Sequence, residues 1–189
     1  MTPISYIALI PLLPLFGFVL LGLFGKKYFN KASGIIGTGL MLGSTILAVY
    51  AAWKYFFVNN HDFYHQVIVF KYTWLSFSPQ VSIDMGAVLD PISVMMIVIV
   101  SFISLMVHIF SLGYMKGEER FGTYYSFLAL FTFSMLGLVL SCNIFQIYIF
   151  WELVGVSSFL LIGFYYKKPS AVAAAKKRSL LPALQTWAS

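Results

Sequence analysis

One acidic residue stands inside a stretch that is otherwise apolar enough to lie within a membrane. It is Glu152, within residues 144–166. A charged side chain at the centre of a spanning helix costs at least about 2.5–3.5 kcal/mol, and such residues commonly mark ion or proton pathways. Burial disfavours the ionised carboxylate, so Glu152 could bind and release a proton as a nearby cation moves. We therefore interpret Glu152 as a proton relay. The alternative is a structural carboxyl group bonded to another helix.

A second titratable side chain, His108, lies about one turn from the end of another apolar stretch. Because an imidazole ordinarily titrates with a pKa of about 6.5, His108 could extend a proton path. It could equally be an interfacial histidine bonded to a backbone carbonyl, and the sequence favours neither reading. His61 and His65 have helical spacing but no third ligand nearby, so we expect no metal site. The single Cys142 excludes an internal disulfide.

The composition predicts the elements that must carry these residues. The 189 residues are 60% hydrophobic and only 10% charged, with a mean hydropathy of +0.88. A soluble domain carries about 25% charged residues, so the chain is expected to be an integral membrane protein. No glycine-rich nucleotide motif or paired-cysteine motif is present, and we expect no bound cofactor.

The predicted fold is an all-α polytopic transmembrane bundle of about five spans plus a truncated sixth. The spans are expected at residues 4–24, 34–57, 91–112, 121–141 and 144–166. Residues 67–74 and 81–85 are β-prone and partly alternating, which predicts a small hairpin in an outer loop. Asp90 is expected to cap the third helix, with Pro91 at its first position.

Several small residues are candidates for close helix contacts. Gly39 and Gly43 have the spacing that lets two membrane helices approach closely, although glycine is also simply tolerated in such helices. Gly155, Ser157 and Ser158 follow the acidic residue closely and predict tight packing around its carboxylate.

The basic residues predict the orientation. Because positive side chains concentrate in cytoplasmic loops, the N-terminus is expected outside, with only Lys54 and Lys71 on the outer side. This pattern explains the net charge of +6 without a nucleic-acid partner. The other ten basic residues are expected inside: Lys26, Lys27, Lys31, Lys116, Arg120, Lys167, Lys168, Lys176, Lys177 and Arg178.

Four stretches carry a resemblance to a known family. They are residues 150–166, which contain Trp-Glu-Leu-Val-Gly; residues 10–15, which contain Pro-Leu-Leu-Pro; Leu-Asp-Pro-Ile-Ser at 89–93; and the segment 108–119, which begins with histidine and contains Tyr-Met. Together they resemble the N-terminal part of the L subunit, or chain five, of proton-translocating NADH:quinone oxidoreductase (respiratory complex I). The antiporter-like superfamily also contains large subunits of Mrp-type sodium/proton antiporters.

The resemblance implies roles and partners. In this family the glutamate matching Glu152 pairs with a lysine on a later, broken helix, and the pair forms the input end of a proton half-channel. His108 matches a family histidine less closely tied to the mechanism. The implied protein is a non-catalytic, proton-translocating membrane subunit of a bacterial inner membrane, and its partners are the other membrane subunits of complex I, the lipid bilayer and protons.

The resemblance also suggests a division of the chain. Residues 1–90 would form a two-helix segment with the outer loop, 91–177 the start of the proton-translocating domain, and 178–189 an aberrant tail. The family's sixth helix should begin near Ala171, yet the residues after Lys177 match it only if their codons are read in a shifted frame. We therefore predict a frameshift, which the gene sequence would test, against a divergent natural end. The alternative functions are an Mrp-type antiporter subunit and an inert truncated membrane fragment.

Overall fold

The computed structural model describes residues 5–25, 32–58, 67–78, 81–115 and 120–165. Five helices in these ranges are long and apolar enough to cross a membrane. The all-α fold and the five predicted spans are therefore confirmed. The predictions for His61 and His65, for a sixth helix from Ala171, and for residues 178–189 lie outside the described ranges.

The helices differ from their predicted bounds by a few residues at most. In chain order they are α1 Ser5–Phe24, α2 Ser33–Trp53 with a π-helical extension Lys54–Val58, α3 Pro91–Tyr114, α4 Phe121–Leu140 and α5 Ile144–Ile162 with a 3-10 turn Gly163–Tyr165. The predicted cap of α3 is confirmed, because the Asp90 side chain accepts a hydrogen bond from the Ser93 amide at 2.6 Å.

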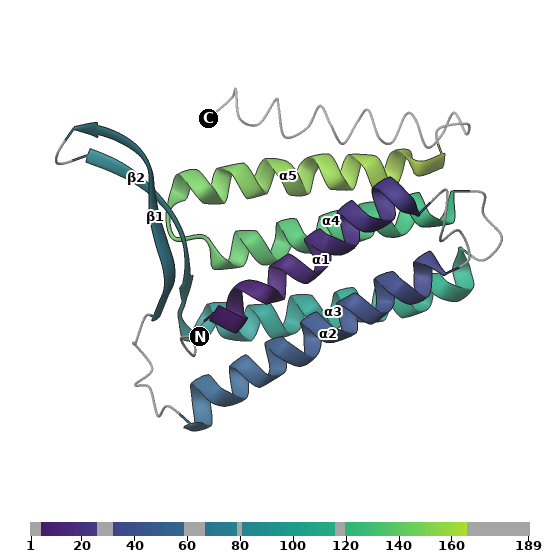
Figure 1. Cartoon of the computed structure of the whole chain (residues 1–189), viewed down its shortest axis with the longest axis horizontal. Coiled ribbons are helices and arrows are strands. Elements are labelled where there is room, and N and C mark those ends of the chain that lie inside the picture. The colour runs from purple at the N-terminus through teal and green to yellow at the C-terminus, as the bar shows by residue number, and fades with distance from the viewer. Residues whose placement is uncertain (1–4, 26–31, 59–66, 79–80, 116–119, 166–189) are drawn as a thin grey trace.

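The two strands of the hairpin are longer than predicted. Strand β1 covers Val67–Ser78 and pairs in antiparallel register with β2, Val81–Leu89. Three register irregularities interrupt the pairing and are consistent with the uneven alternation of the sequence. Figure 1 shows the hairpin lying across one end of the bundle, with its tip extending past α5.

Helix α4 occupies the centre of the bundle, and hydroxyl groups link it to its neighbours. The fully buried Tyr125 donates from its hydroxyl to the His108 carbonyl of α3 at 2.8 Å. Ser126 donates to the Phe18 carbonyl of α1 at 3.1 Å. Hydrogen bonds of this kind contribute to helix association within membranes, where apolar surface alone cannot distinguish a helix from lipid.

The glycines at helix contacts are not the pair singled out by spacing. A Cβ built on Gly39 meets no atom within 4 Å, and one built on Gly43 makes only an ordinary contact with Leu13. Close approaches occur instead at other glycines, and the closest between two helices is at Gly137 of α4, where a built Cβ would lie 2.2 Å from the Phe150 ring of α5. Gly39 therefore reflects ordinary tolerance of glycine in a membrane helix.

The contact at Gly137 generates a stability prediction. We expect Gly137→Ala to lower the unfolding free energy of the purified chain in detergent by about 1–3 kcal/mol, because the added methyl overpacks the interface with Phe150. Gly39→Ala is the matched control, since its methyl enters open space. Thermal unfolding followed by circular dichroism measures both. Equal stability of the two variants would contradict the packing argument.

Candidate functional site

Glu152 lies on the face of α5 that points away from the other helices. Its side chain is exposed, as are those of Trp151 and Val156 on the same side of the helix. At 1.5 Å per residue, Glu152 is about 12 Å from the first residue of α5, Ile144. The carboxylate is therefore well inside the apolar length of the helix but outside the core of the described bundle.

The predicted close packing around this carboxylate is wrong. Ser157 and Ser158 are buried against the bundle, and no atom lies within 4 Å of a Cβ built on Gly155. A helix turns by about 100° per residue, so residues five and six positions after Glu152 lie on a different face. Within the part of the chain that the structure describes, no cation or hydrogen-bond donor contacts the Glu152 carboxylate.

His108 is buried between α3 and α4, with a relative exposure of 1%. Its Nδ1 lies 2.8 Å from the Ser104 carbonyl, and its ring packs edge-on against Tyr125. The Ser104 hydroxyl in turn contacts the Thr132 hydroxyl. A backbone carbonyl as partner of Nδ1 fixes the proton on that nitrogen and leaves Nε2 as an acceptor. Nε2 has no hydrogen-bond partner within the described ranges.

The structure does not bring the two predicted relay residues together. Helix α4 lies between α3, which carries His108, and α5, which carries Glu152 (Figure 1). His108 faces the bundle interior, and Glu152 faces outward. A direct proton exchange between these side chains is therefore excluded within the described arrangement.

A polar junction that was not expected from the sequence joins the hairpin to α5. Gln146, which is buried, donates from Nε2 to the Gly86 carbonyl at 2.9 Å and accepts from the Gly86 amide at Oε1, at 3.1 Å. Asn143 caps α5, because its Oδ1 accepts a hydrogen bond from the backbone amide of Gln146 at 2.7 Å. The Nδ2 of Asn143 donates to the backbone carbonyl of Asp84. The available signal was an asparagine followed three residues later by a glutamine at the start of an apolar stretch.

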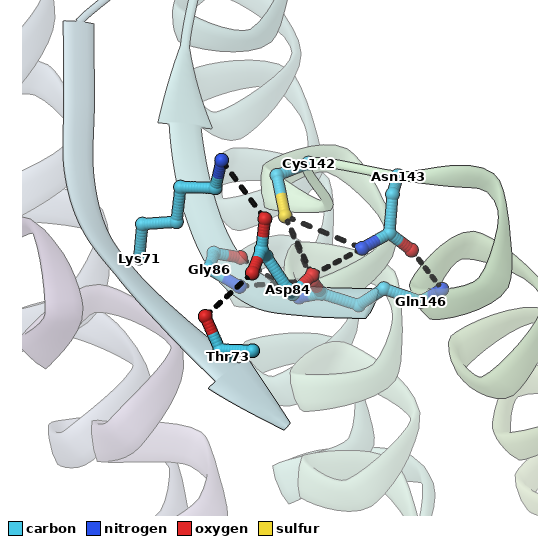
Figure 2. Close-up of polar contacts among 7 residues, drawn as sticks. All are labelled: Lys71, Thr73, Asp84, Gly86, Cys142, Asn143 and Gln146. Atoms are coloured by element: carbon cyan, nitrogen blue, oxygen red, sulfur yellow. Dashed lines mark hydrogen bonds and ion pairs between the residues drawn. The ribbon is translucent and has the colours of Figure 1, made fainter. Parts of the chain in front are cut away.

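Further contacts hold the strand side of this junction in place. Figure 2 shows the Asp84 carboxylate between Lys71, whose Nζ lies 2.9 Å from it, and Thr73, whose hydroxyl donates to it at 2.8 Å. The hydrogen bond with Asp84 raises the pKa of the Lys71 ammonium above its ordinary value. The stabilisation from this pair is thus complete at neutral pH and is lost as the pH rises through that elevated pKa.

No group of three or more His, Cys, Asp or Glu side chains that could hold a metal ion occurs among the residues that the structure describes. The geometry of the described site is that of an outward carboxylate on α5, a buried imidazole on α3 and a polar junction at the hairpin end of α5.

Two family models match the chain and include both predicted relay residues. "NADH-Ubiquinone oxidoreductase (complex I), chain 5 N-terminus" matches residues 74–125, and "NADH:quinone oxidoreductase/Mrp antiporter, TM" matches residues 141–187. The second match continues beyond residue 178, where a shifted reading frame was expected, and that frameshift stays a prediction.

Curated relatives from bacteria, algae and archaea align with nearly the whole chain. Subunit L of NADH-quinone oxidoreductase from Neisseria meningitidis is 37% identical over 182 residues, covering 96% of this chain and 26% of the relative. Subunit 5 of the chloroplast NAD(P)H-quinone oxidoreductase from Zygnema circumcarinatum is 36% identical, over 92% of this chain and 24% of the relative. The F(420)H(2) dehydrogenase subunit L of Methanosarcina mazei is 39% identical, over 91% of this chain and 24% of the relative. The chain thus spans about a quarter of the length of these relatives.

A solved structure shares the fold. A chain of the membrane-bound sulfane sulfur reductase, described as an archaeal respiratory membrane complex, superposes with a TM-score of 0.77 at 17% identity, covering 94% of this chain and 34% of that chain. These relatives are subunits of multi-subunit membrane complexes. The chain belongs to the antiporter-like family of membrane subunits that includes chain 5 of NADH:quinone oxidoreductase.

Proposed function

We propose that this chain is part of a proton-translocating membrane subunit of an NADH:quinone oxidoreductase, with Glu152 as a proton relay. The observation that carries the proposal is the outward carboxylate, which lies about 12 Å along a spanning helix and lacks a partner in the described part of the chain. A carboxylate at that depth is unfavourable in lipid, so the face of α5 that bears it requires a polar or cationic partner.

The relay follows from the electrostatics of a carboxyl group in apolar surroundings. A cation that approaches Glu152 stabilises the ionised form and releases the proton, and its departure favours protonation. By the family resemblance the cation is a lysine on a later helix. In this account the subunit performs no electron transfer itself, and its partners are the other membrane subunits of the complex.

His108 is the second relay group in this proposal. Its Nε2 can accept a proton because the Ser104 carbonyl holds the hydrogen on Nδ1. Since α4 separates His108 from Glu152, the imidazole would serve a different segment of the proton path. An Mrp-type antiporter subunit is the rival function, because the second family model describes both classes. Co-purification of this protein with NADH dehydrogenase subunits would favour the oxidoreductase subunit over the antiporter subunit.

Substitution of Glu152 tests the relay directly. In the full-length protein within its assembled complex, Glu152→Gln should lower proton translocation by on the order of 10²-fold or more, because the neutral amide cannot exchange a proton. Assembly should be unchanged, since the side chain is exposed on the described bundle. Proton uptake by energised vesicles measures the rate. Glu119→Gln, the same substitution between two of the predicted spans, is the control, and normal pumping by the Glu152 variant would refute the relay.

His108→Asn separates a relay from a structural role. The asparagine amide can still donate to the Ser104 carbonyl, but it cannot titrate. We expect a reduced translocation rate with an unchanged thermal unfolding midpoint in the same assembled protein. If translocation is retained in full, the role of His108 is structural, as a hydrogen-bond donor to the Ser104 carbonyl, and His108 is not part of the proton path.

The proposed orientation places the N-terminus and the hairpin outside the cytoplasm of a bacterial cell. Tyr72 on β1 and Tyr114 at the other end of the bundle are 71% and 70% exposed, and they form a matched pair for labelling. In a Cys142→Ser background, a membrane-impermeant maleimide should modify Tyr72→Cys on intact cells and Tyr114→Cys only after permeabilisation. The reverse pattern would show that the N-terminus lies inside.

A further inference from the structure

We propose that Gln146 is a positioning residue for Glu152: it clamps the β1–β2 hairpin to the outer end of α5, and the hairpin thereby fixes the rotation and depth of the helix that carries the carboxylate. This inference rests on the proposed function of Glu152. The clamp itself rests on contacts that involve neither the Glu152 side chain nor a partner protein.

The clamp is a two-point contact between a side-chain amide and a strand. Gln146 donates to the Gly86 carbonyl and accepts from the Gly86 amide, so the side chain pairs with β2 as a neighbouring peptide group would. Gly86 is required in this position, because a Cβ built on it would lie 2.4 Å from the Phe70 carbonyl oxygen of β1. The side chain is 8% exposed, and a buried amide that loses such partners is strongly unfavourable.

The clamp is connected to the cap of the same helix. The Asn143 side chain accepts a hydrogen bond from the backbone amide of Gln146 and donates one to the backbone carbonyl of Asp84 (Figure 2). Asp84 lies two residues from Gly86 on β2. Asp84 is itself held by Lys71 and Thr73 of β1. The first turn of α5 is therefore attached at two points to one strand, and both strands take part. Two attachment points restrict rotation of the helix as well as its translation.

Close packing alone does not fix the outer half of α5. An apolar crevice of about 190 Å³ lies beneath the hairpin, on the bundle side of the helix. Its lining includes Gln146 and Phe150 of α5, Gly137 of α4, and Phe70 and Gly86 of the hairpin. The Phe150 ring packs on Gly137 and the Trp74 ring lies 5.9 Å from the Phe145 ring, so apolar contacts hold α5 beside this space. The polar junction adds the directional contact that fixes the first turn of α5 against β2.

A helix transmits a displacement at its first turn to residues further along. Glu152 follows Gln146 by six residues, or about 9 Å of helix rise, and no contact of the clamp reaches it. Release of the clamp would therefore change the surroundings of the carboxylate through movement of α5. The effect to be measured is a change in the environment of Glu152, beyond a change in stability.

The test uses a series of Gln146 variants in the full-length protein in its membrane assembly. Gln146→Leu removes both hydrogen bonds at similar side-chain size, and Gln146→Glu keeps the acceptor but loses the donor. The readout is the rate at which dicyclohexylcarbodiimide, which reacts with protonated carboxyl groups in apolar surroundings, modifies Glu152 as a function of pH. Mass spectrometry of the Glu152 peptide measures the modification, and thermal unfolding is recorded in parallel.

We expect Gln146→Leu to shift the midpoint of the labelling profile and to change the rate several-fold, with a smaller shift in Gln146→Glu. Ser157→Ala is the control on the same helix, because its hydroxyl donates only to the Val154 carbonyl of α5, and its profile should match the parent. A lower unfolding midpoint with an unchanged labelling profile in both Gln146 variants would overturn the proposal. Labelling does not require pumping, so normal pumping by Glu152→Gln would refute the relay while leaving this measurement interpretable.

Discussion

The bundle depends on hydrogen bonds from side chains to the backbone of neighbouring elements. Apolar surface drives helices together in water, but lipid tails are as apolar as leucine, so packing and polar contacts must supply the specificity. In this chain Ser44 donates to the Ile10 carbonyl at 2.7 Å and joins α2 to α1. Thr45 shares its hydroxyl hydrogen between the Met41 carbonyl of its own helix at 2.9 Å and the Ser101 carbonyl of α3 at 3.2 Å. Together with Tyr125 and Ser126 of α4, these bonds form a continuous set of cross-links from α1 to α4.

Helix α5 is held differently from the other four. It packs on α4 through the contact of the Phe150 ring with Gly137, and it is hydrogen-bonded to the hairpin through Asn143 and Gln146. Its opposite face carries the exposed Trp151 and Glu152. Within the described part of the chain, α5 lies at the edge of the bundle with one face exposed, an arrangement that suits the proposed relay. The proposed relay and the proposed clamp are two consequences of this arrangement.

The family comparisons and the physical reading of Glu152 are independent lines of support. The relatives are named as subunits of NADH-quinone, NAD(P)H-quinone and F(420)H(2) dehydrogenases, and thus differ in the electron donor. A membrane module shared among enzymes with different donors fits a role in ion translocation better than a role in donor chemistry. The described residues include a buried imidazole and an outward carboxylate, the two titratable groups that the proposed relay uses.

The sequence by itself determined the class of the protein, the five spans, the cap at Asp90 and the presence of a hairpin between α2 and α3. These depend on local composition and on the length of apolar stretches, which are properties of short segments. Only the tertiary structure decided which face of α5 carries Glu152, that Gly137 and not Gly39 lies at a helix contact, and that α4 separates His108 from Glu152. It also decided that Gln146 meets Gly86, sixty positions earlier. Spacing along one helix fixes which residues share a face, but the neighbour against which that face packs depends on contacts between segments distant in the chain.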